Sequence, residues 1–522
     1  MTIDLADSTE SQPGRRVVDP MNRRIFLIEP LGTHDLTPSL FTKGNSLEPY
    51  AIECLAGTLE AHNYDVAVLQ QGPLTTAELI ERVAEFAPFC VGISVLTHVA
   101  NHSKRIAEEL RSVIPDVILI AGGQHPSLVP EYIAGTEFDY SVGGEGEVAL
   151  LELLDYVRAA LPSAVLPRGV YIRNGKTSSV IGTPPCPRIR DLDRYPLPKR
   201  TPAYLKTARS WNLSYPQPPA QVAVAQIHYS RGCRYRCTFC VSPPVWNGGH
   251  VEPSSPSVVY RDARAVAQEV RHLHETYGVN LLYFTDLTFN DDSRRVLDLC
   301  EAFDALGLHG SSEQSSDHLE TSVHWFALLK VTLESDVAAA MAKAGCSKVG
   351  IGVESFDAAQ VHSYKKPYKG LETAARTLEA ADAAGIITRC LLVLGADGDT
   401  VHTVARTREG LKYFCADQLR IAFLVPYPGT PIYEQLNGCR LNQNWDLFDE
   451  EHVVLRANGM TKEELYQART DIALNFYASS QYSLRCRNKI ARFPWLTGPY
   501  RWFFTDLFEK TKHRIDLRNL LD

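Results

Sequence analysis

The sequence predicts an α/β protein with two successive domains, each built from strands that alternate with helices. Two observations lead to this fold class. Short apolar runs of strand length alternate with longer segments of helical periodicity over residues 23–167, and the same alternation returns after residue 220. Between the two regions, residues 183–219 are rich in proline, which favours an extended linker over packed elements.

The first region predicts a doubly wound parallel sheet, because its strands and helices alternate along the chain. The expected strands are 25–28, 66–69, 89–95, 117–121 and 140–142. The expected helices between and after them are 49–62, 79–86, 101–113 and 148–156. Ligands of such sheets bind at the carboxyl ends of the strands, where glycines let the backbone approach a bulky ligand.

The second region predicts six βα units, which form an incomplete barrel. The expected strands are 222–227, 280–284, 326–331, 348–352, 387–394 and 418–425. The expected helices are 256–277, 292–306, 336–344, 371–384 and 400–413. Function in barrels of this kind lies at the carboxyl ends of the strands, so we expect the site there.

The chain divides into five expected parts. They are a disordered tail (1–22), the doubly wound domain (23–167), a hairpin with an Asn174-Gly175 turn and a Pro-rich linker (168–219), the partial barrel (220–440) and a small helical C-terminal domain (441–522). The last part carries expected helices at 445–454 and 462–477 and an aromatic segment at 493–521. That segment is either an amphipathic membrane helix or, as we expect, a helix that covers the barrel mouth.

Composition excludes several classes of protein. The 522-residue chain is 45% hydrophobic and 22% charged, as soluble globular proteins are, and its net charge of −8 gives no electrostatic case for nucleic acid. It has no run of about 18 apolar residues, so no membrane span is expected, and its polar start is not a secretory signal. The twelve scattered cysteines suggest a reducing, cytoplasmic location.

Three cysteines mark the expected centre of the chemistry. Cys233, Cys237 and Cys240 are separated by three and then two residues on a loop after an expected strand. Soft thiolates are the ligands of iron–sulfur clusters, and three of them leave one iron of a four-iron cluster open to a small molecule. Nearby positive charge favours the thiolate form, and it comes from Arg231, Arg234 and Arg236. A structural zinc site is the alternative, although no fourth ligand stands at finger-like spacing.

With Phe239 before the last cysteine, this loop reads Cys-x3-Cys-x-aromatic-Cys and resembles the signature of radical S-adenosylmethionine enzymes. The resemblance implies a [4Fe-4S] cluster whose open iron is chelated by the amino and carboxylate groups of S-adenosylmethionine. An electron from the cluster, supplied by a donor such as flavodoxin or ferredoxin, then cleaves the sulfonium to a 5′-deoxyadenosyl radical.

Polar residues at four later strand ends match this family in order. The resemblance implies that Asp286 accepts from the ammonium of S-adenosylmethionine and that Glu354 and Ser355 lie near its ribose or amino acid portion. It also places Gly395 in a turn where Ala and Asp replace the family's Pro and Glu, and Pro426 beside the adenine. Each carboxylate alone is better explained as a helix N-cap or a solvated loop charge. Their recurrence at successive strand ends, in the expected order, argues against that explanation for the set.

The first domain resembles the cobalamin-binding domain that precedes the radical domain in one large subgroup. The residues that carry this resemblance, and that are implied to contact cobalamin, are Ser94, Thr97, Gly122, Gly123, Gln124, Gly143, Gly144 and Glu145. A dinucleotide fold is disfavoured because no Gly-x-Gly-x-x-Gly follows the first strand. The cobalt-ligating Asp-x-His-x-x-Gly is also absent, since Thr33-His34-Asp35 has the wrong order. We therefore expect no histidine on cobalt, and His34, His98 and His125 as loop or wall residues.

Together these resemblances imply a cobalamin-dependent radical methyltransferase. Its substrate would be a small specialised metabolite, as in antibiotic biosynthesis, methylated on an unactivated sp3 carbon or on phosphorus through a 5′-deoxyadenosyl radical and methylcobalamin. One alternative keeps both cofactors but ends in oxidation, cyclisation or ring rearrangement, similar to the anaerobic magnesium-protoporphyrin ester cyclase. A more remote alternative is a corrinoid or cluster sensor without turnover.

Overall fold

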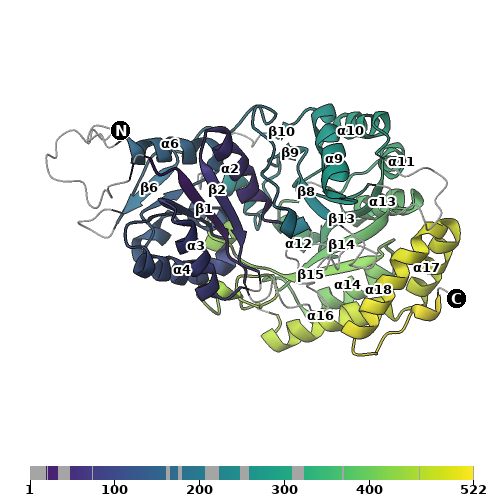
Figure 1. The fold of residues 1–522 in the computed structure, drawn as a ribbon. Helices are drawn as coiled ribbons and strands as arrows, with labels where there is room; N and C mark the ends of the chain where they lie inside the picture. Colours follow the sequence, from purple (N-terminus) through teal and green to yellow (C-terminus); the bar gives the residue numbers. More distant parts are fainter. Residues whose placement is uncertain are drawn as a thin grey trace. The chain divides into compact units, whose positions relative to one another are not determined.

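The computed structural model of the chain describes residues 19, 21–32, 47–72, 74–159, 165–173, 179–205, 223–246, 258–308, 323–366, 370–457 and 459–520. These residues fall into two compact units, one built on strands β1 to β7 and one on the barrel strands β8 to β15 together with the C-terminal helices (Figure 1). Four sequence predictions lie outside the described residues. They concern most of the N-terminal tail, His34, the Asn174-Gly175 turn and residues 206–222 of the linker.

The first unit contains one sheet of seven strands in the order β2-β1-β3-β4-β5-β6-β7. Its strands are β1 Arg24–Glu29, β2 Asp65–Gln70, β3 Cys90–Ser94, β4 Ile118–Gly122, β5 Tyr140–Val142, β6 Val170–Arg173 and β7 Val180–Gly182. The first five pair in parallel, which confirms the doubly wound sheet. The last two pair antiparallel with β5 and with each other, so the hairpin extends this sheet and is not part of the linker.

Helices flank these strands at nearly the expected places. They are α2 Tyr50–Ala61, α3 Thr76–Phe86, α4 Ala100–Val113 and α6 Gly146–Arg158. Apolar residues of β1 such as Ile25 and Leu27 are buried with Leu153 and Leu154 of α6 in one hydrophobic cluster. Burying both faces of a strand requires a continuous apolar run, which explains why β1 reads as one in the sequence.

The second unit contains six parallel strands in the order β15-β14-β13-β12-β11-β8, which is a partial barrel with β8 and β15 at its edges. The strands are β8 Val224–Ile227, β11 Leu281–Phe284, β12 His324–Leu329, β13 Cys346–Glu354, β14 Ile387–Leu394 and β15 Gln418–Phe423. The intervening helices are α9 Ala263–Tyr277, α10 Ser293–Ala305, α11 Ser335–Lys343, α13 Leu371–Ala383 and α14 Val401–Gly410. The six βα units are therefore confirmed.

One helix of the barrel begins later than predicted. The helix expected from residue 256 begins at Ala263, because Asp262 is its N-cap and accepts from the backbone N–H of Arg264 and Ala265. Just before it, β10 Val259–Tyr260 pairs antiparallel with β9 Ser230–Arg231, which opens the cysteine loop. A side-chain cap stops helical extension more strongly than the apolar pattern upstream favours it.

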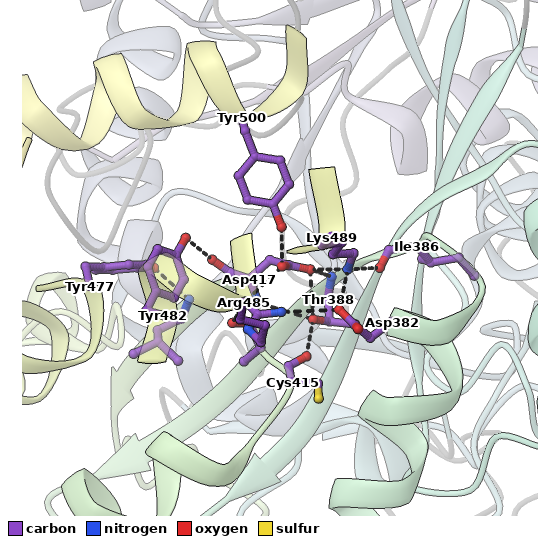
Figure 2. Close-up of polar contacts among 12 residues, drawn as sticks. Asp382, Ile386, Thr388, Cys415, Asp417, Tyr477, Tyr482, Arg485, Lys489 and Tyr500 are labelled. Atoms are coloured by element: carbon purple, nitrogen blue, oxygen red, sulfur yellow. Dashed lines mark hydrogen bonds and ion pairs between the residues drawn. The ribbon is translucent and has the colours of Figure 1, made fainter. Parts of the chain in front are cut away.

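The C-terminal segment packs on the barrel unit through three helices, α16 Lys462–Tyr477, α17 Ser480–Arg492 and α18 Thr497–Lys510. The helix expected at 445–454 is only a short 3₁₀ turn, Trp445–Leu447, and α17 was not predicted. Lys489 of α17 donates to the carbonyl of Ile386 and pairs with Asp417, which precede β14 and β15 directly (Figure 2). The helices α17 and α18 therefore lie at the amino ends of the strands, and the expectation that the final helix covers the carboxyl-end mouth was wrong.

None of the helices in the described ranges combines the length and the apolar character that crossing a bilayer requires.

Candidate functional site

The cysteine loop runs from β9 to α8 (Ser242–Trp246) and is held to the barrel at its centre. The backbone N–H of Thr238 donates to the carbonyl of Tyr364 over 3.0 Å, and the carbonyl of Thr238 accepts from Ile432 over 3.1 Å. The ring of Phe239 packs edge-on against Tyr364 with centroids 5.1 Å apart. The aromatic residue of the motif therefore anchors the loop in an apolar cluster, whatever its contact with a cofactor.

Cys233, Cys237 and Cys240 are free thiols with partly exposed side chains on this loop. Among the described residues, no three His, Cys, Asp or Glu side chains converge on a point that one metal ion could occupy, so nothing in this part of the chain favours a zinc site. Each cysteine of an iron–sulfur cluster binds a different iron, so a cluster does not need such convergence. The donor set of three adjacent thiols fits a cluster.

The positive charge beside the cysteines differs from the prediction. Arg234 pairs with the buried carboxylate of Asp291 over 2.7 Å. Burial raises the pKa of the Cys237 thiol to about 12, and the nearby Lys366 ammonium opposes that rise. Lys366, which sequence reasoning missed, is therefore a cation close to the cluster loop.

A cavity of about 490 Å³ occupies the interior of the barrel. Cys240, Phe239 and Glu354 line it near the carboxyl ends of the strands, and Val425 and Tyr427, which flank Pro426, line it as well. Its walls come from residues of all six strands of the barrel. The apolar members of these walls include Val224, Leu281, Phe326, Leu328, Leu391, Val393 and Ala422.

Glu354 combines burial, an ion pair and an unusual backbone. Its side chain pairs with Lys366 over 2.7 Å, and only 8% of the residue is exposed. Its φ is 64°, at a register irregularity between β13 and β14. Such backbone strain in a non-glycine residue clusters at functional sites. A Cβ at Gly352 would lie 2.5 Å from Glu354 Oε1, so the glycine leaves room for the Glu354 side chain. A Cβ at Gly350 would lie 2.7 Å from Leu328 Cδ2.

Asp286 has contacts that differ from its expected role. Its carboxylate accepts from the backbone N–H groups of Tyr229 (2.9 Å) and Ser230 (2.6 Å) and from the Ser230 hydroxyl (2.5 Å). The residue is 1% exposed, and burial raises its pKa to about 6 despite these hydrogen bonds. Asp286 therefore fixes the strand that leads into the cysteine loop, and it does not line the cavity.

Ser355 and Gly395 also serve local structure. The Ser355 hydroxyl donates to Gln360 Oε1 over 2.6 Å, and the Gly395 N–H donates to Asp399 over 2.7 Å. Gly395 has a φ of 87°, which explains why the turn after β14 carries glycine. Neither residue is among those that line the cavity. Of the residues predicted to contact S-adenosylmethionine, the structure therefore brings Phe239, Glu354 and the surroundings of Pro426 together.

The residues predicted to contact cobalamin gather at the carboxyl edge of the first sheet. Ser94 ends β3 beside Gly122 at the end of β4, and Gly143 and Gly144 follow β5. Ser127, which sequence reasoning missed, connects the two loops. Its hydroxyl donates to the carbonyl of Gly123 (2.7 Å) and accepts from the Gly144 N–H (2.9 Å). A Cβ at Gly122 would meet nothing within 4 Å, so the space beside this residue is open.

Three residues of this loop region are buried. Gln124 begins a short helix, α5 Gln124–Leu128. The next residue, His125, is fully buried, so it is a core residue. Burial lowers the pKa of His125 to about 4, and its Nδ1 lies 3.4 Å from the Thr97 hydroxyl. Thr97 is 1% exposed, and Glu145 is buried with Arg188 at 3.3 Å. These contacts make Thr97 and Glu145 supports of the edge.

Comparison with known proteins gives two family matches. Residues 40–154 match the B12 binding domain, and residues 227–411 match the radical SAM superfamily. An uncharacterised methyltransferase of Pyrococcus horikoshii is 25% identical over 451 residues, covering 83% of this chain and 88% of that protein. The anaerobic magnesium-protoporphyrin IX monomethyl ester cyclase of Synechocystis is 25% identical over 453 residues, covering 84% and 82%.

Solved structures agree with the fold. The radical S-adenosylmethionine methyltransferase TsrM from Kitasatospora setae, with cobalamin and a [4Fe-4S] cluster bound, superposes with a TM-score of 0.67 and 18% identity. The match covers 94% of this chain and 99% of that one.

Proposed function

Because the chain belongs to the cobalamin-binding radical S-adenosylmethionine enzymes, we propose that it transfers a methyl group to an unactivated sp3 carbon, or to phosphorus, of a small specialised metabolite. The observation that carries the proposal is the cavity wall that Cys240 of the cluster loop shares with Phe239 and Glu354. When bound, the cluster, S-adenosylmethionine and cobalamin supply radical formation and methyl transfer. The protein positions the reactants and excludes water.

The residues have distinct proposed tasks. Cys233, Cys237 and Cys240 hold the cluster, and Asp286 fixes the approach to their loop through the Tyr229 and Ser230 backbone. We assign the Glu354–Lys366 pair to the polar portion of S-adenosylmethionine, because both groups are charged, buried and close to the cysteines. Ser94, Gly122, Gly123, Gly143 and Gly144 would hold cobalamin by its edges and tail, without a protein histidine on cobalt.

The test is product analysis under anaerobic conditions. The protein is reconstituted with iron, sulfide and cobalamin, reduced, and given S-adenosylmethionine with a labelled methyl group and candidate substrates. We expect 5′-deoxyadenosine, S-adenosylhomocysteine and a substrate that carries the label. Formation of both adenosine products without methylation of any substrate would leave the radical chemistry in place and refute the transferase.

Matched cysteine variants separate the cluster from general thiol effects. Cys237→Ser should abolish cleavage of S-adenosylmethionine and lower the bound iron. Cys439→Ser is the control, because Cys439 is also a partly buried free thiol of the barrel unit but lies outside the loop. Equal iron content in both variants would contradict the assignment of the ligands.

A second candidate keeps the cofactors but ends in cyclisation or oxidation of the substrate. The similarity to the Synechocystis cyclase, equal in identity to that of the Pyrococcus methyltransferase, favours its consideration. Product analysis distinguishes the two, since only methyl transfer consumes a second S-adenosylmethionine to give S-adenosylhomocysteine. For either chemistry we propose a cytoplasmic enzyme that takes its electron from a flavodoxin or ferredoxin and does not act on nucleic acid.

A further inference from the structure

Three cations line the barrel cavity at the end away from the cysteines. Lys348 of β13, Arg389 of β14 and Arg420 of β15 each stand at the third position of their strand. Glu354, near the cysteines, is the last residue of the same β13. Gly350 is the register partner of Arg389, and Leu391 is the partner of Arg420, so the cations occupy neighbouring strands with small offsets. They form a cationic floor.

The charges of this floor are compensated unequally. Arg420 pairs with Glu451 over 2.5 Å and lies 3.5 Å from Glu450. Lys348 is 2% exposed and stacks its ammonium over the Phe326 ring at 5.4 Å. Within the described ranges, Arg389 has no ion pair with a carboxylate, and its buried Nε has no hydrogen-bond partner.

Arg389 is buried next to a second cation, Arg420. Burial, together with the neighbouring Arg420 guanidinium, lowers its pKa to about 10. The hydroxyl-bearing Tyr283 lines the same cavity and is close enough to Arg389 for their charges to interact. Guanidinium groups bind carboxylates and phosphates through two parallel hydrogen bonds. A buried charge is costly unless it is paired with an opposite charge.

We propose that the cationic floor of Lys348, Arg389 and Arg420 binds an anionic group of the substrate, a carboxylate or a phosphate. The remainder of the substrate then extends along the apolar walls toward Cys240 and Glu354. This inference rests on the proposed function, because it assumes that the substrate enters this cavity. It restricts the substrate class to metabolites with one anionic end and an apolar body.

The test measures anion binding by the reconstituted holoenzyme saturated with S-adenosylmethionine. The probes are inorganic phosphate and hexanoate, with hexanol as the neutral control, followed by calorimetry and by the shift in melting temperature. We expect at least one anion to bind and to raise the melting temperature, and hexanol to bind at least tenfold more weakly than hexanoate if the site takes carboxylates. Binding of phosphate alone would assign a phosphorylated substrate.

Variants identify the residue responsible. Arg389→Met should weaken anion binding at least tenfold, and Arg389→Lys should retain part of it because the charge remains. Arg408→Gln, an exposed arginine on α14, is the control and should bind as the wild type does. Equal anion affinity in wild type and Arg389→Met overturns the proposal, as does the absence of anion binding by the wild type.

Failure of the inference can be told from failure of the proposed function. Transfer of the labelled methyl group to a substrate reports the proposed function, and it is measured separately from anion binding. An enzyme that methylates a substrate but binds no anion retains the proposed function and loses the cationic floor. If the folded Arg389→Met variant is unobtainable, the Arg389→Lys variant and the melting shift of the wild type still decide the question.

Discussion

Two neighbouring residues of β14 meet opposite electrostatic environments. Thr388 faces the buried carboxylate of Asp417, which accepts from its N–H (2.7 Å), pairs with Lys489 (2.7 Å) and Arg485 (2.9 Å), and accepts from the Tyr500 hydroxyl (Figure 2). Arg389, the next residue, faces the cavity, where its Nε has no partner among the described residues. A strand turns successive side chains to opposite faces, so one residue separates the compensated Asp417 cluster from the uncompensated charge of Arg389.

The difference shows what each buried charge does. The Asp417 cluster joins α17 and α18 to the amino ends of β14 and β15, so its charges stabilise the fold. Burial alone raises the pKa of Asp417, but Lys489 and Arg485 outweigh it and hold the pKa well below its usual range. The cationic floor lacks such compensation at Arg389, which indicates a ligand and not a structural partner.

The largest effect is expected from Asp417→Ala. Among the described residues, the substitution leaves Lys489 and Arg485 with only Asp382 as a carboxylate partner. Breaking a buried ion pair typically costs about 3–5 kcal/mol of unfolding free energy. Urea unfolding followed by tryptophan fluorescence measures the loss. Asp516→Ala breaks an exposed ion pair with Arg518 and should cost far less, because solvent screens exposed charges. Similar losses in both variants would contradict the role of the cluster.

Acid titration tests the same cluster without removing a side chain. The pKa of Asp417 is lower in the folded than in the unfolded protein, where Asp titrates near about 3.9. Its stabilisation is therefore fully present above about pH 4 and is lost as the pH falls further, toward the folded-state pKa. The unfolding free energy of Asp417→Asn should fall less steeply below about pH 4 than that of the wild type.

A smaller loss is expected from Tyr500→Phe. The substitution removes one hydrogen bond to the Asp417 carboxylate and keeps the buried ring, so the cost should be about 1.5–3 kcal/mol. The same unfolding measurement applies. The double variant Asp417→Ala with Tyr500→Phe should lose less than the sum of the single losses, because the two residues share one interaction.

The smallest effect on stability is expected from Arg389→Met. Replacing an uncompensated buried cation by an apolar side chain of similar length should change the unfolding free energy by less than about 1 kcal/mol, or raise it. A loss above about 2 kcal/mol would mean that Arg389 has a structural partner, and the contrast with Asp417 would then fail.

Local sequence patterns predicted the strands of the two main sheets, most of the helices between them and the cysteine loop, because each depends on residues close in the chain. The position of the C-terminal helices depends instead on a pair 72 residues apart, Asp417 and Lys489, which no periodicity reveals. The role of Asp286 was missed for a similar reason. Its partners Tyr229 and Ser230 are more than 50 residues away, and a strand-end carboxylate resembles a ligand equally well before they are known.

The cationic floor had a signal in the sequence that was not used. Arg389 is the one charged residue of β14, and it alternates with Leu391 and Val393, which also line the cavity. A charge within a buried strand requires a partner or a ligand. Lys366 carried no comparable signal, because its partner Glu354 precedes it by 12 residues across a helix.

The two glycines of β13, Gly350 and Gly352, determine how much of the cavity's length is open to a substrate. Each lies on the one strand that carries both Lys348 and Glu354, and each leaves out the side chain that would otherwise divide the cavity between them. A single added methyl group at Gly350 would shorten the space available to a substrate while every proposed cofactor ligand stayed in place. Substrate size in this enzyme can therefore be retuned, by evolution or by design, at Gly350. A Cβ at Gly352 would instead lie 2.5 Å from Glu354 Oε1 and would disturb the pair assigned to S-adenosylmethionine.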